Sequence, residues 1–388
     1  MRIFKSITIS IFLALQFYLH EPALAQTPIL IQDEEFVVDA RVAIDSLYNR
    51  NPEAAKKILQ PWISAYPEHP LWPLWDAMEL WWFVLNDLAD DQYDEEFFNR
   101  MKRADYEAGR LLNREPDHPD ALIVRAVANG YAARQNANRG NWITSINIGR
   151  RAYQAYSRLM EVVPNLPDNY FALGMMRYYS AHVIEKYPVA RVGSRFLPDG
   201  DKEEGVQFLT NAYYDGVFAR PEAAYFLGFI LLNYEDEEDE AAKIFRTMSE
   251  IYPRNSYYHR LYVRSLMQMR DYELAEVEIQ NALQEWDAHG GGVNTILHEE
   301  LYYWKGRIFF YRGNLSKAED FFMTAYEIGL YLPNTKDRQF HAVSAYYLAR
   351  VYERLNNHEK ASKYYQISLD QNSSDVVKRL AQTRLDNL

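Results

Sequence analysis

The sequence predicts an all-α fold: a right-handed superhelical solenoid of about eight helical hairpins with a C-terminal capping helix. Two observations predict this fold. A unit with small residues at fixed positions of two successive helices recurs along the chain, and Tyr-Pro or Val-Pro dipeptides close several units, at 66–67, 163–164 and 252–253. One hairpin cannot bury its own apolar face, whereas stacked hairpins share a continuous core. We therefore expect no strands of consequence.

The repeated unit is clearest over residues 220–371. A pair of positions recurs in four successive units, thirteen residues apart in the first unit and twelve in the others, and a large residue follows the second position by four. The pairs are Gly228 and Ala241, Val263 and Ala275, Gly306 and Ala318, and Ala349 and Ala361; the large residues are Phe245, Ile279, Phe322 and Tyr365.

Gly306 lies in the middle of an aromatic-rich helical stretch, "YYWKGRIFFY". Glycine inside a helix costs about 1 kcal/mol relative to alanine. Either a closely approaching ligand or a neighbouring helix could offset this cost. Because Ala318 is also small, we expect the two helices of the hairpin to pack closely here, and the glycine to serve this packing.

The helices before residue 220 are predicted from the same hairpin pattern. They cover 34–49 and 52–66, 70–88 and 94–114, and 119–138 and 141–163, and Asn51-Pro52 is a helix-start signal. The next helix carries Leu173-Gly174, and its partner follows an inserted loop at 182–203. The capping helix is expected near 374–386.

The N-terminus is typical of a secretory signal peptide. Arg2 and Lys5 precede a mostly apolar stretch at 7–19, and Ala23-Leu24-Ala25 supplies the small residues of a cleavage site. We expect residues 1–25 to be removed and the solenoid to comprise 26–388. An uncleaved anchor is the alternative, although the apolar stretch is shorter than the ~20 residues that a spanning helix needs.

The location expected from this signal peptide is the periplasm. The chain contains no cysteine, which excludes a bacterial lipoprotein anchor, disulfides, cysteine nucleophiles and thiolate metal sites. No later stretch is long and apolar enough to cross a bilayer. The formal net charge of −12 opposes phosphate backbones, so nucleic acid is not expected as a partner.

The repeated unit resembles the tetratricopeptide repeat (TPR), in which Leu-Gly, an aromatic residue, Ala, Phe, Ala and Pro recur over 34 residues. Ala241 and Ala275 are separated by that length, and the later alanines by 43 residues. The middle of the chain is also weakly similar to a TPR subgroup found in eukaryotic proteins of mitochondrial inclusion clearance, through Gly200-Asp201, Gly205 and Arg220-Pro221-Glu222-Ala223.

The TPR resemblance implies a concave groove lined by the first helix of each hairpin. Transferred position by position, the groove residues are Phe171, Met175, Tyr178, Tyr179, Tyr225, Phe229, Leu232, Arg260, Arg264, Tyr303, Arg307, Tyr346 and Arg350. Arg264, Arg307 and Arg350 are equivalent in three successive units, so they would form a ladder of guanidinium groups beside an aromatic wall.

Such a ladder could capture carboxylates, because arginine binds them in a bidentate manner. The alternative is that these arginines pair with acidic neighbours of the solenoid or are solvated. The TPR clamps that hold chaperone C-termini carry Lys and Asn at such positions, and this sequence has neither, so that partner is not expected.

No catalytic, metal or cofactor site is predicted. The acidic "YEDEEDEAA" at 234–242 lacks the central glycine of an EF-hand loop, and His298-Glu299-Glu300 has no second histidine at metal spacing. The chain contains no G-x-S-x-G, phosphate-binding loop or dinucleotide glycine pattern.

The leading hypothesis is a non-enzymatic secreted scaffold that binds a protein or peptide in its groove; neither the partner nor the oligomeric state is predicted. One alternative is a glycan- or small-ligand-binding module that uses the aromatic residues at 72–82. Another is an all-helical glycosidase with paired carboxylates. The glycosidase would need helices that close into a ring, whereas the fixed alanine spacing favours an open solenoid.

Overall fold

The computed structural model describes residues 26–186 and 199–388, and this part of the chain contains α- and 3₁₀-helices without β-strands. The predicted helical solenoid is confirmed. A short 3₁₀-helix, η1 (Leu30–Gln32), precedes the first hairpins. These hairpins are α2 (Glu34–Tyr48) with α3 (Pro52–Ala65), α4 (Leu71–Asn86) with α5 (Asp94–Leu112), α6 (Pro119–Asn138) with α7 (Trp142–Val162), and α8 (Asn169–Lys186) with α9 (Lys202–Asp215).

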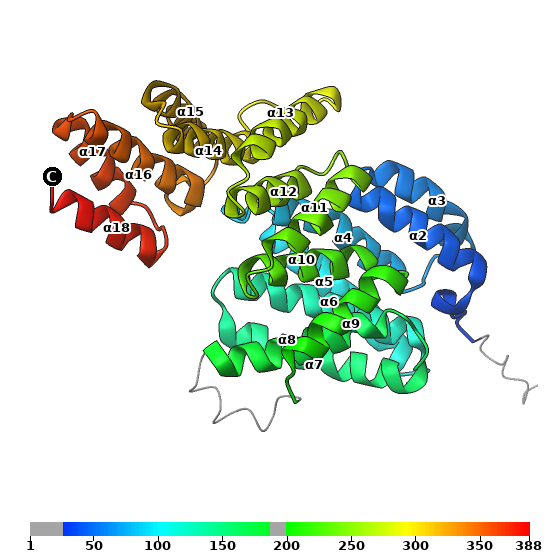
Figure 1. The fold of residues 1–388 in the computed structure, drawn as a ribbon. Coiled ribbons are helices and arrows are strands. Elements are labelled where there is room, and N and C mark those ends of the chain that lie inside the picture. Colours follow the sequence, from blue (N-terminus) through cyan, green and yellow to red (C-terminus); the bar gives the residue numbers. More distant parts are fainter. Residues whose placement is uncertain (1–25, 187–198) are drawn as a thin grey trace, which may run out of the picture.

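Four further hairpins and a single helix complete the described chain (Figure 1). The hairpins are α10 (Arg220–Asn233) with α11 (Glu238–Ile251), α12 (Ser256–Gln268) with α13 (Tyr272–Ala288), α14 (Ile296–Tyr311) with α15 (Leu315–Tyr331), and α16 (Gln339–Arg354) with α17 (His358–Leu369). A 3₁₀-helix, η4 (Thr335–Asp337), precedes α16, and α18 (Asp375–Leu385) packs on α17 as the predicted capping helix.

The helix boundaries follow local signals in the sequence. Asn51, Asp271, Asn314 and Asn357 each accept a hydrogen bond from a backbone N–H of the helix that they precede. Such caps satisfy donors that have no partner inside the helix. The boundaries predicted for the helices between 34 and 163 and for the capping helix agree with the structure to within two residues.

Small residues allow close packing inside each hairpin, as predicted, but the contact at Gly306 differs in detail. A Cβ on Gly306 would lie 2.5 Å from Cδ1 of Phe322, and one on Gly228 would lie 2.7 Å from Cζ of Phe245. Each glycine thus makes room for an aromatic ring of the second helix, that of Phe322 or Phe245, which lies four residues after the small residue of that helix. The alanine at that small position, Ala318, is itself fully buried.

The insertion expected at 182–203 is shorter than predicted. Helix α8 continues to Lys186 and α9 begins at Lys202, so both ends of the expected loop are helical. Residues 187–198 lie outside the described part of the chain, as does the expected signal peptide at 1–25.

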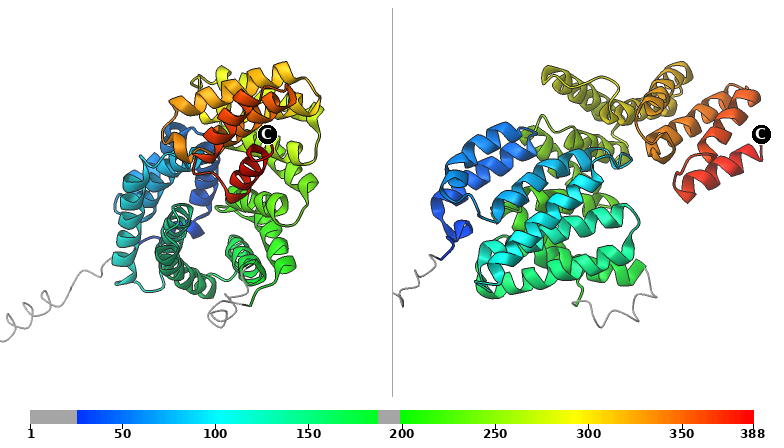
Figure 2. Two further views of the ribbon diagram at one scale, coloured as in Figure 1. Left: turned by 90° about the vertical axis from the view of Figure 1, so that its left-hand side faces the viewer. Right: turned by 180° about the vertical axis from the view of Figure 1, so that it is seen from behind.

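The first five hairpins complete one superhelical turn, and this turn closes on itself. Figure 1 shows α2 beside α11 and α12, and the left view of Figure 2 shows helices α2 to α12 around a central space. The expected open solenoid is therefore wrong for this half of the molecule. The spacing of the alanines predicts how the two helices of one hairpin pack together. It does not predict the rotation between successive hairpins, which accumulates along the solenoid.

Hydrogen bonds between distant residues hold the closure. Asp45 of α2 accepts from Nη2 of Arg220 at 2.7 Å and from the hydroxyl of Tyr252 at 2.6 Å. The hydroxyl of Tyr48 donates to Glu222 at 2.7 Å, and the side-chain amide of Asn255 donates to the carbonyl oxygen of Tyr48 at 2.8 Å. The first hairpin is thus fixed to α10, α11 and the start of α12.

The helices from α13 onward extend away from the closed turn (Figures 1 and 2). They are attached to it through the loop between α4 and α5. Arg338 donates to Asp87 of that loop at 2.9 Å, and the amide of Asn334 donates to the carbonyl oxygen of Ala89 at 2.8 Å. In the described ranges, no helix combines the length and apolarity required to cross a membrane.

Candidate functional site: a central cavity and an aromatic–arginine strip

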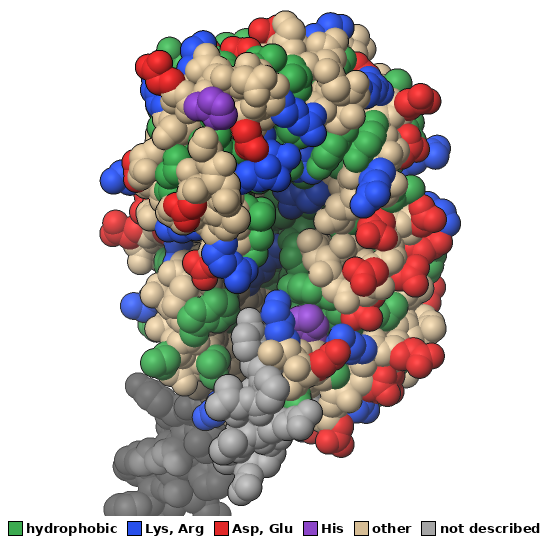
Figure 3. All heavy atoms as spheres, turned by 60° about the vertical axis from the view of Figure 1, so that its left-hand side comes forward, with side chains coloured by type: hydrophobic (Ala, Val, Ile, Leu, Met, Phe, Trp, Pro, Cys, Tyr) green, Lys and Arg blue, Asp and Glu red, His purple; other side chains and the backbone are tan. Residues whose placement is uncertain are grey.

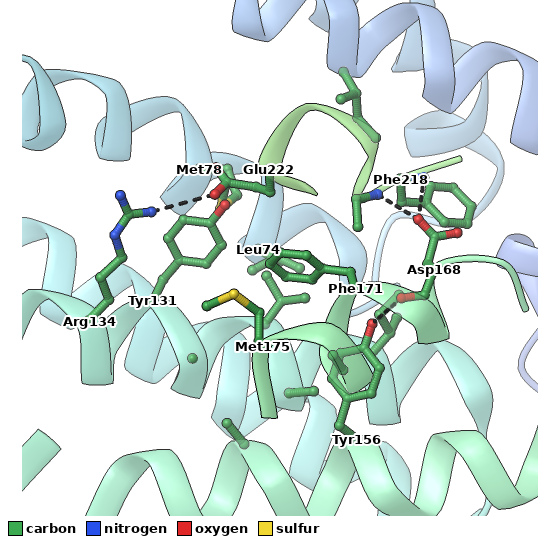
Figure 4. A pocket seen from close by; sticks show the side chains of 18 of the residues that line it. Leu74, Met78, Tyr131, Arg134, Tyr156, Asp168, Phe171, Met175, Phe218 and Glu222 are labelled. Atoms are coloured by element: carbon green, nitrogen blue, oxygen red, sulfur yellow. Dashed lines mark hydrogen bonds and ion pairs between the residues drawn. The ribbon is translucent and has the colours of Figure 1, made fainter. Parts of the chain in front are cut away.

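A cavity of about 600 Å³ lies inside the closed turn. Its walls come from α2, α4, α6, α7, α8 and the start of α10, and they are almost entirely apolar (Figure 4). Leu74, Met78, Phe171 and Met175 are among the side chains that line it. Its volume lies within the range of ligand pockets, roughly 300–1,000 Å³.

One polar group of the cavity is centred on Arg134 of α6. Its guanidinium carbon lies 4.8–4.9 Å from the ring centres of Trp81, Tyr225 and Phe226, and Nη1 lies 3.5 Å from Oε2 of Glu222. Stacking on aromatic faces stabilises a buried guanidinium. Burial raises the pKa of Tyr131, which also lies here, and the negative charge of Glu222 raises it further.

The other polar group is formed by Asp168 and Tyr156. The carboxylate of Asp168 accepts hydrogen bonds from the backbone N–H groups of Phe218 at 2.7 Å and Ala219 at 2.6 Å. Burial raises the pKa of Asp168, although these backbone donors act in the opposite direction. Tyr156 donates to the carbonyl oxygen of Asp168. These contacts hold the segment before α10 against the start of α8.

The two carboxylates of the cavity do not form a catalytic pair. Asp168 and Glu222 lie on different sides of the cavity in Figure 4. Asp168 is occupied by backbone donors, and Glu222 is bound by Tyr48 and Arg134. Both carboxylates thus already make contacts that hold the walls of the cavity together.

The predicted groove residues of the last three hairpins lie along successive first helices, and we call them the aromatic–arginine strip: Arg260 and Arg264 of α12, Tyr303 and Arg307 of α14, and Tyr346 and Arg350 of α16. Their environments differ. Arg260 is buried and contacts Glu300 at 3.3 Å, and Arg264 contacts Glu300 at 2.7 Å. Since Glu300 is fully buried, these two arginines mainly neutralise an internal carboxylate.

Arg307 has a different set of partners. It donates to the hydroxyl of Tyr303 at 2.7 Å and to that of Tyr311, and its guanidinium lies 4.5 Å from the ring centre of Tyr347. Among the residues that the structure describes, no carboxylate forms an ion pair with it. Its charge is therefore held in place by aromatic residues and is not neutralised by an acidic neighbour.

Arg350 is only weakly paired. Its Nε lies 4.0 Å from Glu353, and Nη1 donates to the hydroxyl of Tyr346 at 3.4 Å. Glu353 has two stronger contacts, with Arg384 at 2.9 Å and with the hydroxyl of Tyr365. Both Arg307 and Arg350 are half-buried.

The groove residues predicted in the fourth and fifth units lie partly in the cavity. Phe171, Met175 and Tyr179 line it. Tyr178 is fully buried, and its hydroxyl donates to Glu235. Phe229 is half-buried and packs against Tyr225, which is itself buried with Leu232. These residues therefore belong to the wall of the cavity and to the core of the closed turn.

Aromatic contacts connect the cavity to the strip. Tyr225 lies over Arg134 and pairs with Tyr257 through their hydroxyls at 3.3 Å. The ring of Tyr257 in turn lies 5.2 Å from the guanidinium of Arg260. In Figure 3 a hollow in the surface has hydrophobic walls and Lys or Arg side chains in its depth. This hollow thus presents basic side chains in its depth, although the chain as a whole is acidic.

The tryptophans at 72–82 do not form an exposed platform for sugars. Trp81 and Trp82 are buried in the core, and Trp72 is buried with Nε1 donating to the carbonyl oxygen of Tyr66 at 2.6 Å. Trp72 and Trp75 do line the cavity. Trp81 and Trp82 therefore fill the inner layer of the solenoid, whereas Trp72 and Trp75 lie at the wall of the cavity.

Sequence reasoning missed several charged residues of the inner layer. Arg134, Glu222, Glu300 and Arg338 were assigned no role, although each forms an ion pair that is largely shielded from solvent. The burial of Glu300 could have been predicted from the sequence, because this residue lies four residues before Trp304 within an apolar helix. The contacts of Arg134 could not have been predicted, because its partners come from helices about 50 and 90 residues away. Within the described ranges no cluster of three or more metal-ligating side chains occurs.

No protein-family model and no curated protein matches this sequence. Among solved structures, yeast Tom70 has 11% identity and a TM-score of 0.43, and the match covers 77% of this chain but only 60% of Tom70. Human IFIT1, solved as a dimer with PPP-AAAA, has 14% identity and a TM-score of 0.41 over 85% of this chain and 72% of its own.

MamA from Desulfovibrio magneticus RS-1 has 17% identity and a TM-score of 0.34, over 53% of this chain and 96% of its own. Tom70, IFIT1 and MamA are TPR-type helical repeat proteins, and their similarity to this chain concerns the fold alone. The predicted TPR resemblance agrees with the fold of the chain, a helical solenoid of stacked hairpins.

Proposed function

We propose that this chain is a non-enzymatic scaffold that binds an acidic segment of another protein along the aromatic–arginine strip. The observation that carries the proposal is the environment of Arg307. Its guanidinium is fixed by two tyrosine hydroxyls and an aromatic face and has no acidic partner among the described residues. Arginines held in this way are preorganised to bind carboxylates, because little side-chain entropy is lost on binding.

Arg350 extends the same surface by one hairpin. Arg350 lies one repeat after Arg307, and the distance of 4.0 Å between its Nε and the carboxylate of Glu353 is long for an ion pair. A peptide that crosses α14 and α16 can place one acidic side chain on each guanidinium. Arg264 contributes less in this proposal, since Glu300 already neutralises it. The binding surface therefore centres on the last two hairpins.

The test is a peptide array of Asp- and Glu-rich sequences beside counterparts with Asn and Gln. We expect the acidic peptides to bind in a salt-dependent manner, and their amide counterparts to bind at least tenfold more weakly. The double variant Arg307→Gln with Arg350→Gln should lose this preference, since glutamine at 307 can still bond to Tyr303 without offering a charge.

The matched control changes two arginines outside the strip, Arg110→Gln and Arg246→Gln. Each is exposed and pairs with a carboxylate of its own helix. This control variant should bind as the unaltered protein does. If the strip variant and the control bind acidic peptides equally well, the strip is not the binding surface.

The proposal includes export across the inner membrane, with the periplasm as the place of action. It is supported by the charged, apolar and small-residue segments at 1–25. N-terminal sequencing of the chain from a periplasmic fraction should begin at Gln26. Recovery of the full-length chain in the cytosolic or membrane fraction would argue against this location.

A further inference from the structure

We propose that the central cavity is a binding site for a long-chain aliphatic carboxylate, with its hydrocarbon chain among the apolar walls and its carboxylate at Arg134. This site is separate from the strip, so the proposal does not depend on the peptide partner. It rests on the chemistry of the cavity walls and on the position of one cation.

The walls favour a hydrocarbon chain over a peptide or a sugar. Leu74, Met78, Phe171 and Met175 supply no strong hydrogen-bonding group. A peptide or sugar buried among them would leave polar groups without partners, which is unfavourable. An aliphatic chain has no polar groups that need partners, and its burial against these walls removes apolar surface from water.

Arg134 specifies the head group. It is the cation among the residues that line the cavity, and its contact with Glu222 is long, at 3.5 Å. Glu222 also accepts a shorter hydrogen bond, at 2.7 Å, from Tyr48. A guanidinium has five N–H donors, so Arg134 can donate hydrogen bonds to a second carboxylate in addition to Glu222. The rings of Trp81, Tyr225 and Phe226 fix its orientation.

Gly130 offers a direct way to fill the cavity. It lines the cavity within α6, and a Cβ built on it meets no atom within 4 Å. Leucine is a better helix former than glycine, so Gly130→Leu should fold and occupy part of the space. The matched control is Gly109→Leu in α5, where the added Cβ would make an ordinary contact with Arg125 outside the cavity.

The experiment titrates the purified mature chain with hexadecanoate and with hexadecanol, using calorimetry and thermal unfolding. We expect saturable 1:1 binding of hexadecanoate with a raised melting temperature, weakened at least tenfold by Gly130→Leu and unchanged by Gly109→Leu. Absence of saturable hexadecanoate binding, or equal binding by Gly130→Leu, would overturn the proposal.

The role of Arg134 is tested with the neutral double variant Arg134→Met with Glu222→Gln, which leaves no unpaired charge. It should bind hexadecanoate at least tenfold more weakly and hexadecanol unchanged. An equal loss for both ligands would refute the assignment of the head group to Arg134.

A fluorescence measurement locates the chain independently of these variants. Bromohexadecanoate should quench tryptophan emission, and Trp75→Phe should reduce this quenching because Trp75 lines the cavity. The control Trp286→Phe, in α13, should leave the change on binding intact. Quenching that disappears in the control and persists in Trp75→Phe would place the ligand elsewhere and contradict the proposal.

Discussion

Arg338 and Glu299 form a buried ion pair in which Nε and Oε2 lie 3.2 Å apart and each side chain is 1% exposed. Arg338 also contacts Asp87, which lies 251 residues earlier in the chain, at 2.9 Å. Through Asp87, Arg338 therefore connects the extended C-terminal hairpins to the closed turn. Burial raises the pKa of Glu299 to about 7, even though Arg338 lowers it.

The raised pKa of Glu299 makes the stability of this junction depend on pH. In the unfolded chain the carboxyl group of Glu299 has its ordinary pKa of 4.5, so between about pH 4.5 and 7 the folded state binds more protons. The contribution of Glu299 to the free energy of unfolding is thus fully present below pH 4.5 and is lost as the pH rises through 7. The shift corresponds to about 3 kcal/mol at most.

Glu299→Gln should remove this dependence, because glutamine keeps the shape of the side chain without the charge. We expect the free energy of unfolding, measured with urea, to change less between pH 5 and pH 8 in the variant than in the unaltered chain. An unchanged pH profile would show that Glu299 titrates normally in the folded protein.

Gly306 should not tolerate a methyl group. Alanine there gains helix propensity, but its Cβ would lie 2.5 Å from the ring of Phe322, which is fully buried. We expect Gly306→Ala to reduce the free energy of unfolding by about 1–3 kcal/mol, the usual effect of overpacking. Gly130→Ala is the control: its Cβ meets open space, so it should stabilise the protein by up to about 1 kcal/mol.

Asp45 should be important for closure of the first turn. Asp45→Ala removes the acceptor for Arg220 and for the buried hydroxyl of Tyr252. We expect a loss of about 1–3 kcal/mol in unfolding free energy and faster amide hydrogen exchange in α2 and α11. The loss should be smaller in a Tyr252→Phe background, since the hydroxyl that needs this acceptor is absent there. Strict additivity of the two changes would contradict the coupling.

Arg264 and Arg350 occupy equivalent positions, but they should differ in their contribution to stability. Arg264→Ala weakens the neutralisation of the fully buried Glu300, so we expect a loss of about 1–3 kcal/mol in urea unfolding. Arg350→Ala removes a long ion pair and should cost less than about 1 kcal/mol. Equal losses would mean that the strip is uniformly structural.

The sequence was a good guide to everything decided within one hairpin. Capping residues such as Asn314 and Asn357 set the helix boundaries, and the spacing of Gly306, Ala318 and Phe322 encodes the contact between two neighbouring helices. The equivalence of Arg264, Arg307 and Arg350 was also readable, because the repeat fixes their positions on the helix.

Features that depend on several repeats together could not be predicted. Closure of the turn requires Asp45 to meet Tyr252, and this follows from small rotations added over ten helices. The cavity is a consequence of the closure. The same holds for the pairing of Arg134 with Glu222 and of Arg338 with Asp87, since nothing near these residues in the sequence indicates their partners.

The closed turn has a consequence for how the chain acquires its structure during synthesis. The partners of α2 lie 174 to 207 residues later, at Glu222, Tyr252 and Asn255. The first hairpin to leave the ribosome therefore cannot reach its final environment until α12 has been made, and contacts so distant in sequence form slowly. Under the export proposed above, this delay keeps the N-terminal hairpin unfolded and able to be transported while the rest of the chain is made.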